Sequence, residues 1–324
     1  MFARTLLPLD GSAAAEEALP VAARIARASR GSMHLLTVVK SPIDLGEEND
    51  FDPLLSEQEI ETGTTVASNY LRTIVALPVL DGIQITTEIA PGLAPQYILA
   101  AARSGEFDLT VLSSHGRTGF TRWVLGSVAR TLAHESTVPT LVLHEHETAP
   151  LLAHLDAARP LRALVPLDGS PLAEAALAPA AHLVASLTTQ GELHLTHVVK
   201  PVRTSAEEDV ESSLNAKATA RASTYLTQVT ERLQAMVKEL GISISCSVAC
   251  GTDVASALLS QAEPGAQGQA TADSRGSDLI AISTHGRHGL ERWEAVWGTE
   301  TMGSVTDRLL NTTKLPLLIV RPQT

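Results

Sequence analysis

The feature that most constrains the fold of this chain is an internal repeat. Five segments of the first half recur in the second half in the same order, and together they cover most of both halves. The matching pairs are LLPLDGSAAAEEAL (6–19) with ALVPLDGSPLAEAAL (163–177), MHLLTVVKSP (33–42) with LHLTHVVKPV (193–202), ASNYL (67–71) with ASTYL (222–226), FDLTVLSSHGR (107–117) with SDLIAISTHGR (277–287), and TVPTLVLHE (137–145) with KLPLLIVRP (314–322). Because each copy of such a repeat is one structural unit, we predict two domains, 1–150 and 151–324.

Within each copy, short apolar segments alternate with segments of helical periodicity. In the first copy the strand-like segments are TLLPLD, MHLLTVV, IQITTEIA, LTVLSS and TLVLHE; helical segments separate them at 12–29, 57–78, 94–104 and from 127 onward. Strands that are buried on both faces and separated by helices form a doubly wound parallel sheet. The sequence therefore predicts an α/β protein made of two tandem doubly wound domains, each with a five-stranded parallel sheet.

Charge and composition narrow the class of partner. The 324 residues carry a formal net charge of −12, which argues against nucleic acid or an anionic membrane as the main partner, since both attract basic surfaces. No stretch reaches the roughly 20 apolar residues of a membrane span, and the N-terminus lacks the pattern of a secretory signal. Cys246 and Cys250 lie four apart on one predicted strand and are expected to be reduced thiols. We therefore expect a cytoplasmic protein.

Two glycine-bearing turns fall where an open α/β sheet binds its ligands, outside the carboxyl ends of the strands. The stretch SSHGRTGF (113–120) begins where the predicted strand LTVLSS ends. Gly126 and Ser127 precede a helix, whose free N–H groups and positive dipole end suit a phosphate, and the spacing suits a di- or triphosphate. On these residues alone, two turn glycines and a helix cap explain the pattern equally well. Neither the P-loop nor the dinucleotide-binding fingerprint is present.

With these segments in view, the chain resembles the universal stress protein family, as a tandem of two such domains. The resemblance rests on PLDGS in both halves, the VV that ends the second strand, Gly92 and Gly251 after the strand-like segments IQITTEIA and ISISCSVAC, HGR, and GS before the last helix. The family's ATP-binding pattern is Gly, two residues, Gly, nine residues, then Gly-Ser or Gly-Thr. In the first copy nine residues separate Gly116 from Gly126-Ser127, which fits, whereas Ser113 replaces the first glycine. The resemblance implies a Rossmann-like fold of the adenine nucleotide alpha hydrolase-like type.

The resemblance also implies a set of nucleotide-binding residues in the first copy. Leu9, Asp10 and Val38 would lie on the adenine and ribose side, and Gly92 would let its strand end close to the nucleotide. The phosphates would be held by Ser113, His115, Gly116, Arg117, Gly126, Ser127 and Val128. Three of these have a plainer explanation: Asp10 as part of an Asp-Gly turn, His115 as a partner of the loop backbone, and Arg117 as a solvated charge.

The second copy keeps part of this set but changes its spacing. Asp168, Val198, Gly286 and Arg287 remain, but sixteen residues separate Gly286 from Gly303-Ser304, and eleven separate it from the alternative Gly298-Thr299. The extra residues, EAVWGTE, include acidic side chains that would repel phosphate if they folded inward. If they bulge outward, Gly303 and Ser304 could still cap the helix and bind phosphate. We expect an altered and weaker second site.

These expectations favour a regulatory nucleotide-binding protein. It would bind ATP or another adenine nucleotide mainly in the first domain, with Mg²⁺ accompanying the phosphates, and would act in a stress response. The alternatives are a scaffold that binds no nucleotide and a transferase; the sequence shows no catalytic carboxylate pair for the latter, and a slow ATPase is the most activity that the resemblance allows. The resemblance also implies a pseudo-twofold pairing of the two domains through their last strands. Further association of two chains into a homodimer is left open by the sequence.

Overall fold

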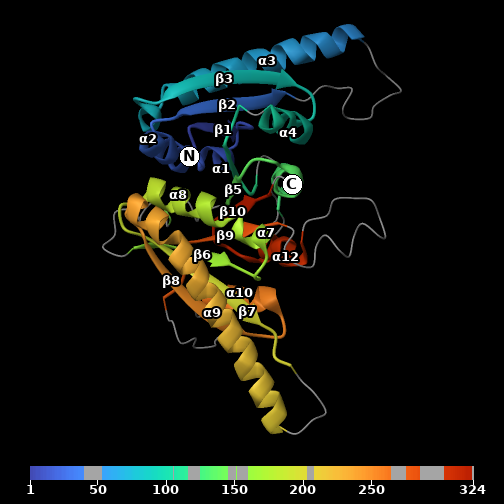
Figure 1. The fold of residues 1–324 in the computed structure, drawn as a ribbon. Helices are drawn as coiled ribbons and strands as arrows, with labels where there is room; N and C mark the ends of the chain where they lie inside the picture. The colour runs from blue at the N-terminus through green and yellow to red at the C-terminus, as the bar shows by residue number, and fades with distance from the viewer. Residues whose placement is uncertain are drawn as a thin grey trace. The chain divides into compact units, whose positions relative to one another are not determined.

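The structure is a computed structural model, and it describes residues 1–39, 53–104, 106–115, 125–144, 151, 160–202, 208–263, 275–284 and 303–322. The chain divides into two compact units, Met1–Leu152 and Ala153–Thr324. Each unit contains one copy of the repeat, and the elements of both are labelled in Figure 1.

The first unit alternates strands and helices in the predicted order. Its elements are β1 (Arg4–Pro8), α1 (Ala13–Glu16), α2 (Leu19–Ser29), β2 (Ser32–Val39), α3 (Pro53–Val75), the 3₁₀ turn η2 (Pro78–Leu80), β3 (Gln84–Pro91), α4 (Ala94–Arg103), β4 (Leu109–Ser113), α5 (Ser127–Glu135) and β5 (Thr140–Leu143). Its strands lie in the order β3-β2-β1-β4-β5, and all four pairings are parallel. The order reverses between β1 and β4, so this is the switch point at which such sheets bind ligands.

The second unit repeats this arrangement. Its elements are β6 (Leu161–Pro166), α7 (Pro171–Glu174), α8 (Leu177–Leu187), β7 (Gly191–Val199), α9 (Glu208–Leu240), β8 (Ser243–Cys250), α10 (Val254–Ala262), β9 (Leu279–Ser283), α12 (Ser304–Thr312) and β10 (Leu317–Val320). Its strand order is β8-β7-β6-β9-β10, again with parallel pairings. The predicted α/β fold class, with a five-stranded parallel sheet in each unit, is therefore confirmed.

Helices cover both faces of each sheet. Right-handed crossovers place the helices that follow β1 and β2 on one face and those that follow β3 and β4 on the other. In agreement, α4 packs beside α5, α8 beside α9, and α10 beside α12. The 33 residues of α9 give a helix of about 50 Å, and it extends well past the sheet that it covers (Figure 1).

The predicted single helix at 12–29 is divided in two. The helix stops after α1 and resumes as α2, with Pro20 at the second helical position. Proline lacks an N–H group and its ring clashes with the carbonyl four residues earlier, so a continuous helix through Pro20 is disfavoured. Pro179 stands one position later, as the third residue of α8, and the second unit has the same division into two helices. The prediction of one continuous helix was wrong for this reason.

The core of each unit is aliphatic and centred on the inner strands. Leu6 and Leu7 in β1, and Leu164 and Val165 in β6, are completely buried. Because consecutive residues are buried, these strands are covered on both faces, as parallel sheets require. Among the described residues no helix is long and apolar enough to cross a membrane.

Candidate functional site

The first candidate residues follow β1 at the carboxyl edge of the first sheet. The N–H of Leu9 donates to the carbonyl of Leu36 at 2.8 Å, which extends the β1–β2 pairing by one residue. Asp10 accepts hydrogen bonds from the backbone and the hydroxyl of Ser12, at 3.0 and 2.6 Å. Ser12 in turn caps α1 by accepting from the N–H of Ala15. The Asp10 carboxylate therefore shapes the turn, and the turn holds it at the edge of the sheet.

Val38 and Gly92 come together at the ends of β2 and β3. Val38 is half-buried and pairs with Ala90. The N–H of Gly92 donates to the Val39 carbonyl at 2.9 Å. The φ angle of Gly92 is +129°, and a Cβ added there would meet no atom within 4 Å. Only glycine adopts this conformation readily, and the space above it is open.

The end of β4 is tied directly to the start of α5. The N–H of Ser114 donates to the Leu143 carbonyl at 2.7 Å, and the Ser114 carbonyl accepts from the N–H of Gly126 at 2.8 Å. A Cβ at Gly126 would lie 3.0 Å from that carbonyl oxygen, so a side chain there would push the helix away. Ser113 is the last residue of β4. The Nδ1 atom of His115 lies 2.9 Å from the Ser114 hydroxyl.

The N-terminus of α5 opens at this edge of the sheet. Gly126 is the N-cap, and no side chain in the described part of the chain caps the helix. Ser127 is exposed and Val128 is half-buried. The N–H groups of a first helical turn have no acceptor within the helix, and together with the dipole they form a natural anion site.

The structure thus places the described candidates of the first unit, from Leu9 to Val128, at the carboxyl edge of one sheet. Two further candidates of this unit, Gly116 and Arg117, lie outside the described residues. So do Gly286 and Arg287 of the second unit.

The second unit reproduces the turn and the helix cap. Asp168 accepts from the N–H and hydroxyl of Ser170 at 2.9 and 2.6 Å, as Asp10 does from Ser12. Val198 pairs with Ala249, as Val38 does with Ala90. Gly303 is the N-cap of α12, followed by the exposed Ser304. Gly303-Ser304 rather than Gly298-Thr299 therefore corresponds to Gly126-Ser127.

Two differences from the first unit lie at this edge. The φ angle of Gly251 lies outside the left-handed range, and an added Cβ would lie 3.0 Å from the Cβ of Ala257. Beside it, Asp253 pairs with Arg308 of α12 at 2.5 Å, which joins the two helices next to the candidate site. The turn after the third strand is thus closed by contacts in the second unit, whereas it is open in the first.

Sequence reasoning missed His144, which directly follows β5. Burial, and secondly the neighbouring His115, lower the pKa of His144 to about 4. The two histidines follow adjacent strands whose last residues, Ser113 and Leu143, are paired. The Nε2 atoms of both rings are buried and have no hydrogen-bond partner among the described residues. The signal was present in the sequence, because a histidine directly after the last strand falls on the same edge as the predicted site.

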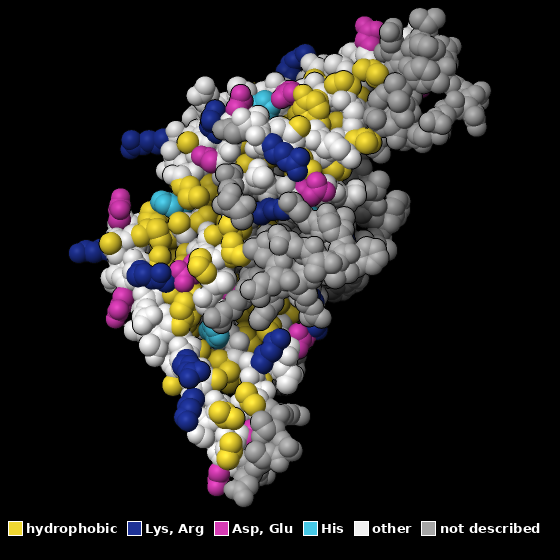
Figure 2. All heavy atoms as spheres, turned by 45° about the vertical axis from the view of Figure 1, so that its right-hand side comes forward, with side chains coloured by type: hydrophobic (Ala, Val, Ile, Leu, Met, Phe, Trp, Pro, Cys, Tyr) yellow, Lys and Arg dark blue, Asp and Glu magenta, His cyan; other side chains and the backbone are white. Residues whose placement is uncertain are grey.

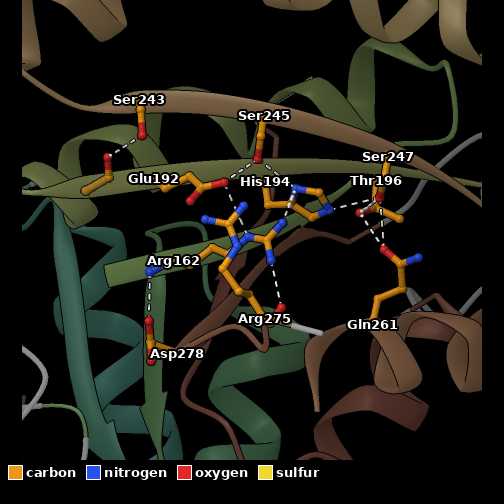
Figure 3. Close-up of polar contacts among 11 residues, drawn as sticks. Arg162, Glu192, His194, Thr196, Ser243, Ser245, Ser247, Gln261, Arg275 and Asp278 are labelled. Carbon is orange, nitrogen blue, oxygen red and sulfur yellow. Dashed lines mark hydrogen bonds and ion pairs between the residues drawn. The ribbon is translucent and has the colours of Figure 1, made fainter. Parts of the chain in front are cut away.

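A second polar cluster lies in the second unit, away from the carboxyl edge (Figure 3). Arg162 of β6 is 4% exposed; its guanidinium pairs with Glu192 at 3.4 Å and lies 2.7 Å from Nδ1 of His194. The other ring nitrogen of His194 lies 2.9 Å from the Ser247 hydroxyl, which donates to Gln261 at 2.9 Å. The row Ser247, His194, Arg162, Glu192 contains the residue types of a nucleophilic triad, with Arg162 between the histidine and the glutamate.

The direction of the hydrogen bonds rules out that role. A guanidinium can only donate, so Nδ1 of His194 must accept and Nε2 must carry the proton. The imidazole then donates to Ser247, whereas a catalytic base must accept from its serine. This cluster is a buried structural network.

Figure 2 shows the distribution of charge on one face. The Lys and Arg side chains of the described residues stand mostly singly among acidic and hydrophobic ones. A protein that follows a nucleic-acid backbone needs a continuous basic surface, and the described part of this face does not provide one.

Comparison with known proteins identifies the family. The model of the universal stress protein family matches residues 1–144 and 161–321, which is most of the chain and one match for each copy of the repeat. The chain therefore belongs to the universal stress protein family, as a tandem two-domain member.

Individual relatives agree with this assignment. Universal stress protein MJ0531 of Methanocaldococcus jannaschii is 30% identical over 145 residues, which are 44% of this chain and 82% of that protein. A universal stress protein of Mycolicibacterium smegmatis is 31% identical over 138 residues, 43% of this chain and 44% of that protein. Among solved structures, a universal stress protein from Archaeoglobus fulgidus matches with a TM-score of 0.66 and 18% identity over 99% of both chains. At that identity the last likeness shows the fold alone.

Proposed function

We propose that the first unit binds ATP or a related adenine nucleotide at the carboxyl edge of its sheet, and that the protein acts as a regulator in a stress response. The nucleotide would lie across the switch point between β1 and β4. Mg²⁺ would bind together with the phosphates, because their oxygen atoms are the kind of ligand that this ion prefers. The proposed role of the site is to bind the nucleotide. The only catalytic activity that we assign to it is slow hydrolysis of ATP.

The observation that carries this proposal is the contact between Gly126 and the end of β4. Because glycine leaves only 3.0 Å between its missing Cβ position and the Ser114 oxygen, the first turn of α5 sits directly against the strand end. Its N–H groups then face the space beyond β4, where a phosphate chain would accept hydrogen bonds. The exposed hydroxyl of Ser127 adds a further donor at the same place.

The base and the ribose would lie toward β1 and β2. The turn after β1 holds the Asp10 carboxylate at the edge, where it can accept hydrogen bonds from ribose hydroxyls. Val38 offers backbone groups and an apolar side chain for the base. The open space at Gly92 lets the ligand pass close to the backbone there.

The second unit would bind nucleotide more weakly than the first. The fourth residue of α12 is Asp307, whereas the fourth residue of α5 is Arg130. A carboxylate in the first turn competes for the positive end of the helix and repels phosphate. The Asp253–Arg308 pair also fixes the helix ends beside the site.

The proposal is tested by nucleotide content and stoichiometry. The purified protein is denatured and any released nucleotide identified by chromatography; ATP with Mg²⁺ is then titrated by calorimetry. We expect one ATP per chain. Gly126→Glu should abolish binding, because the side chain collides with the Ser114 carbonyl and places a charge at the helix N-terminus, whereas the matched variant Gly303→Glu should leave it intact.

Other results would change the conclusion. Two ATP per chain would show that both units bind. No binding at millimolar ATP would overturn the proposal and favour a scaffold that acts through protein contacts alone. The proposal places the protein in the cytoplasm, which the two free, exposed thiols of Cys246 and Cys250 suit.

A further inference from the structure

His115 and His144 form a pair at the border of the proposed phosphate site. They follow adjacent parallel strands, whose last residues Ser113 and Leu143 are paired in register. A Cβ built on Gly126 lies 3.8 Å from the Cα of His115, so His115 touches the N-cap of α5. The pair therefore connects the helix N-terminus with the end of β5.

Each ring has one nitrogen without a hydrogen-bond partner among the described residues. Nδ1 of His115 is held by the Ser114 hydroxyl at 2.9 Å, which fixes the orientation of that ring. The Nε2 atoms of both His115 and His144 are buried and have no hydrogen-bond partner among the described residues. Buried polar atoms without a partner are costly and rare in folded proteins, so they point to a group that binds there.

We propose that His144, at the strand end beside His115, takes up a proton when the phosphate chain of a nucleotide binds, so that nucleotide affinity rises as the pH falls. This inference rests on the proposed function. It assigns His144 to the site as a further residue that recognises the phosphate chain, and it gives the site a pH dependence of its own.

The direction of the pH dependence follows from the protonation state of His144 in the nucleotide-free protein. Burial lowers the pKa of His144 to about 4, so its ring is neutral at pH 7. An anion beside the pair favours the charged form and raises that pKa. Between the free and the bound pKa, binding then takes up a proton, and affinity increases by at most about tenfold for each pH unit of acidification.

Among the described residues, the remaining titratable or charged groups on the elements around the pair are Asp10 after β1, Glu16 and Glu17 at α1, and Arg130, His134 and Glu135 in α5. Asp10 is held by Ser12, and Arg130 is exposed to solvent. The charge closest in effect on His144 is that of His115.

The second copy of the repeat carries Arg321 where the first has His144. An arginine side chain is a fixed cation, whereas a histidine can be neutral or charged. The arginine of the second copy also suggests the variant His144→Arg for the first.

The test is calorimetric titration of ATP with Mg²⁺ at pH 6.0, 7.0 and 8.0, each in two buffers of different ionisation enthalpy. Wild type is compared with His144→Gln, which cannot be charged, and with His144→Arg, which copies the second unit. Since the phosphate itself titrates near pH 6 to 7, the readout is the difference between wild type and variants. Circular dichroism confirms that each variant is folded.

We expect about tenfold tighter binding by wild type at pH 6.0 than at pH 8.0, beyond any change in the variants. His144→Gln should bind weakly at every pH, and His144→Arg tightly at every pH, both without extra proton uptake. Equal pH profiles and equal proton uptake in all three proteins would overturn this inference alone. Absence of binding in wild type would overturn both it and the proposed function.

Discussion

Arg162 is a buried residue whose loss should destabilise the second unit. Its guanidinium is buried and donates to the Arg275 carbonyl at 2.7 Å and to His194 at 2.7 Å, and it pairs with Glu192 at 3.4 Å. These contacts join β6 to β7 and to the segment before β9 (Figure 3). We predict that Arg162→Met destabilises the second unit strongly.

The magnitude follows from what the substitution leaves behind. Glu192 would keep the hydroxyl of Ser245 as a donor but lose its cation while remaining buried. Removing one partner of a buried ion pair costs about 3–5 kcal/mol, because the other charge stays uncompensated. In a unit of this size, Ala153–Thr324, each kcal/mol lowers Tm by about 2–4 °C, so we expect a loss of about 10 °C.

The repeat supplies a matched control. Arg4 in β1 corresponds in the repeat to Arg162 in β6, but its side chain is exposed, so Arg4→Met should change stability by no more than about 0.5 kcal/mol. Urea unfolding followed by circular dichroism gives the free energies. Hydrogen exchange of peptides from β6 to β8 shows that the loss falls in the second unit.

A double substitution separates charge from packing. Arg162→Met with Glu192→Leu removes both charges, and much of the loss should be recovered because no buried charge remains unpaired. If Arg162→Met costs less than about 1 kcal/mol, or no more than Arg4→Met, the reasoning from buried charge is refuted.

Three further predictions can be checked on the same protein. Gly92→Ala should cost about 1–3 kcal/mol in urea unfolding, because alanine is strained at a φ of +129°; an unchanged midpoint would mean that the turn relaxes. The pKa of Asp253 is lowered chiefly by the Ser256 hydroxyl and also by Arg308, so its stabilising effect is full above the ordinary value of 3.8 and is lost as the pH falls through the lowered pKa. Ser256→Ala and Arg308→Gln should therefore each raise this pKa in an NMR titration, and an unchanged pKa in either variant would contradict the assignment. Finally, Cys246 and Cys250 are free and exposed, so a thiol reagent should modify both in the native protein, and slow reaction of either would show that it is covered.

The fold was readable from the sequence because repetition and periodicity are strong signals. Two copies of the same alternation of strands and helices predicted both sheets and the number of strands in each. The division of the first helix was not predicted, although Pro20 and Pro179 were visible. A proline near a helix start is compatible with a new helix as well as with a continuous one that is kinked, and only packing on the sheet decides between them.

The site was predicted less completely than the fold. Spacing alone brought Gly126 and Ser127 to the strand ends, but it could not show that Gly126 must be glycine because of the Ser114 carbonyl. His144 was missed because its importance depends on burial and on a neighbour 29 residues earlier in the sequence, His115. Contacts of that kind are set by strand order, which a single sequence does not specify.

The differences between the two copies argue for a division of roles rather than for two equal sites. A histidine occupies the same position in β2 and β7, yet His34 pairs with Glu88 at 3.0 Å while His194 meets Arg162. A buried polar network such as that of Arg162 and His194 costs free energy unless every member has a hydrogen-bond partner. In the second unit these polar residues therefore serve the structure of the domain. The candidate site of the first unit keeps open space at its third strand and no acidic residue in the first turn of its helix. If only the first unit binds nucleotide, Arg162→Met should lower the stability of the chain while leaving ATP affinity and stoichiometry nearly unchanged below the melting temperature. A parallel loss of ATP binding would show that the second unit contributes to the site and would refute the division of roles.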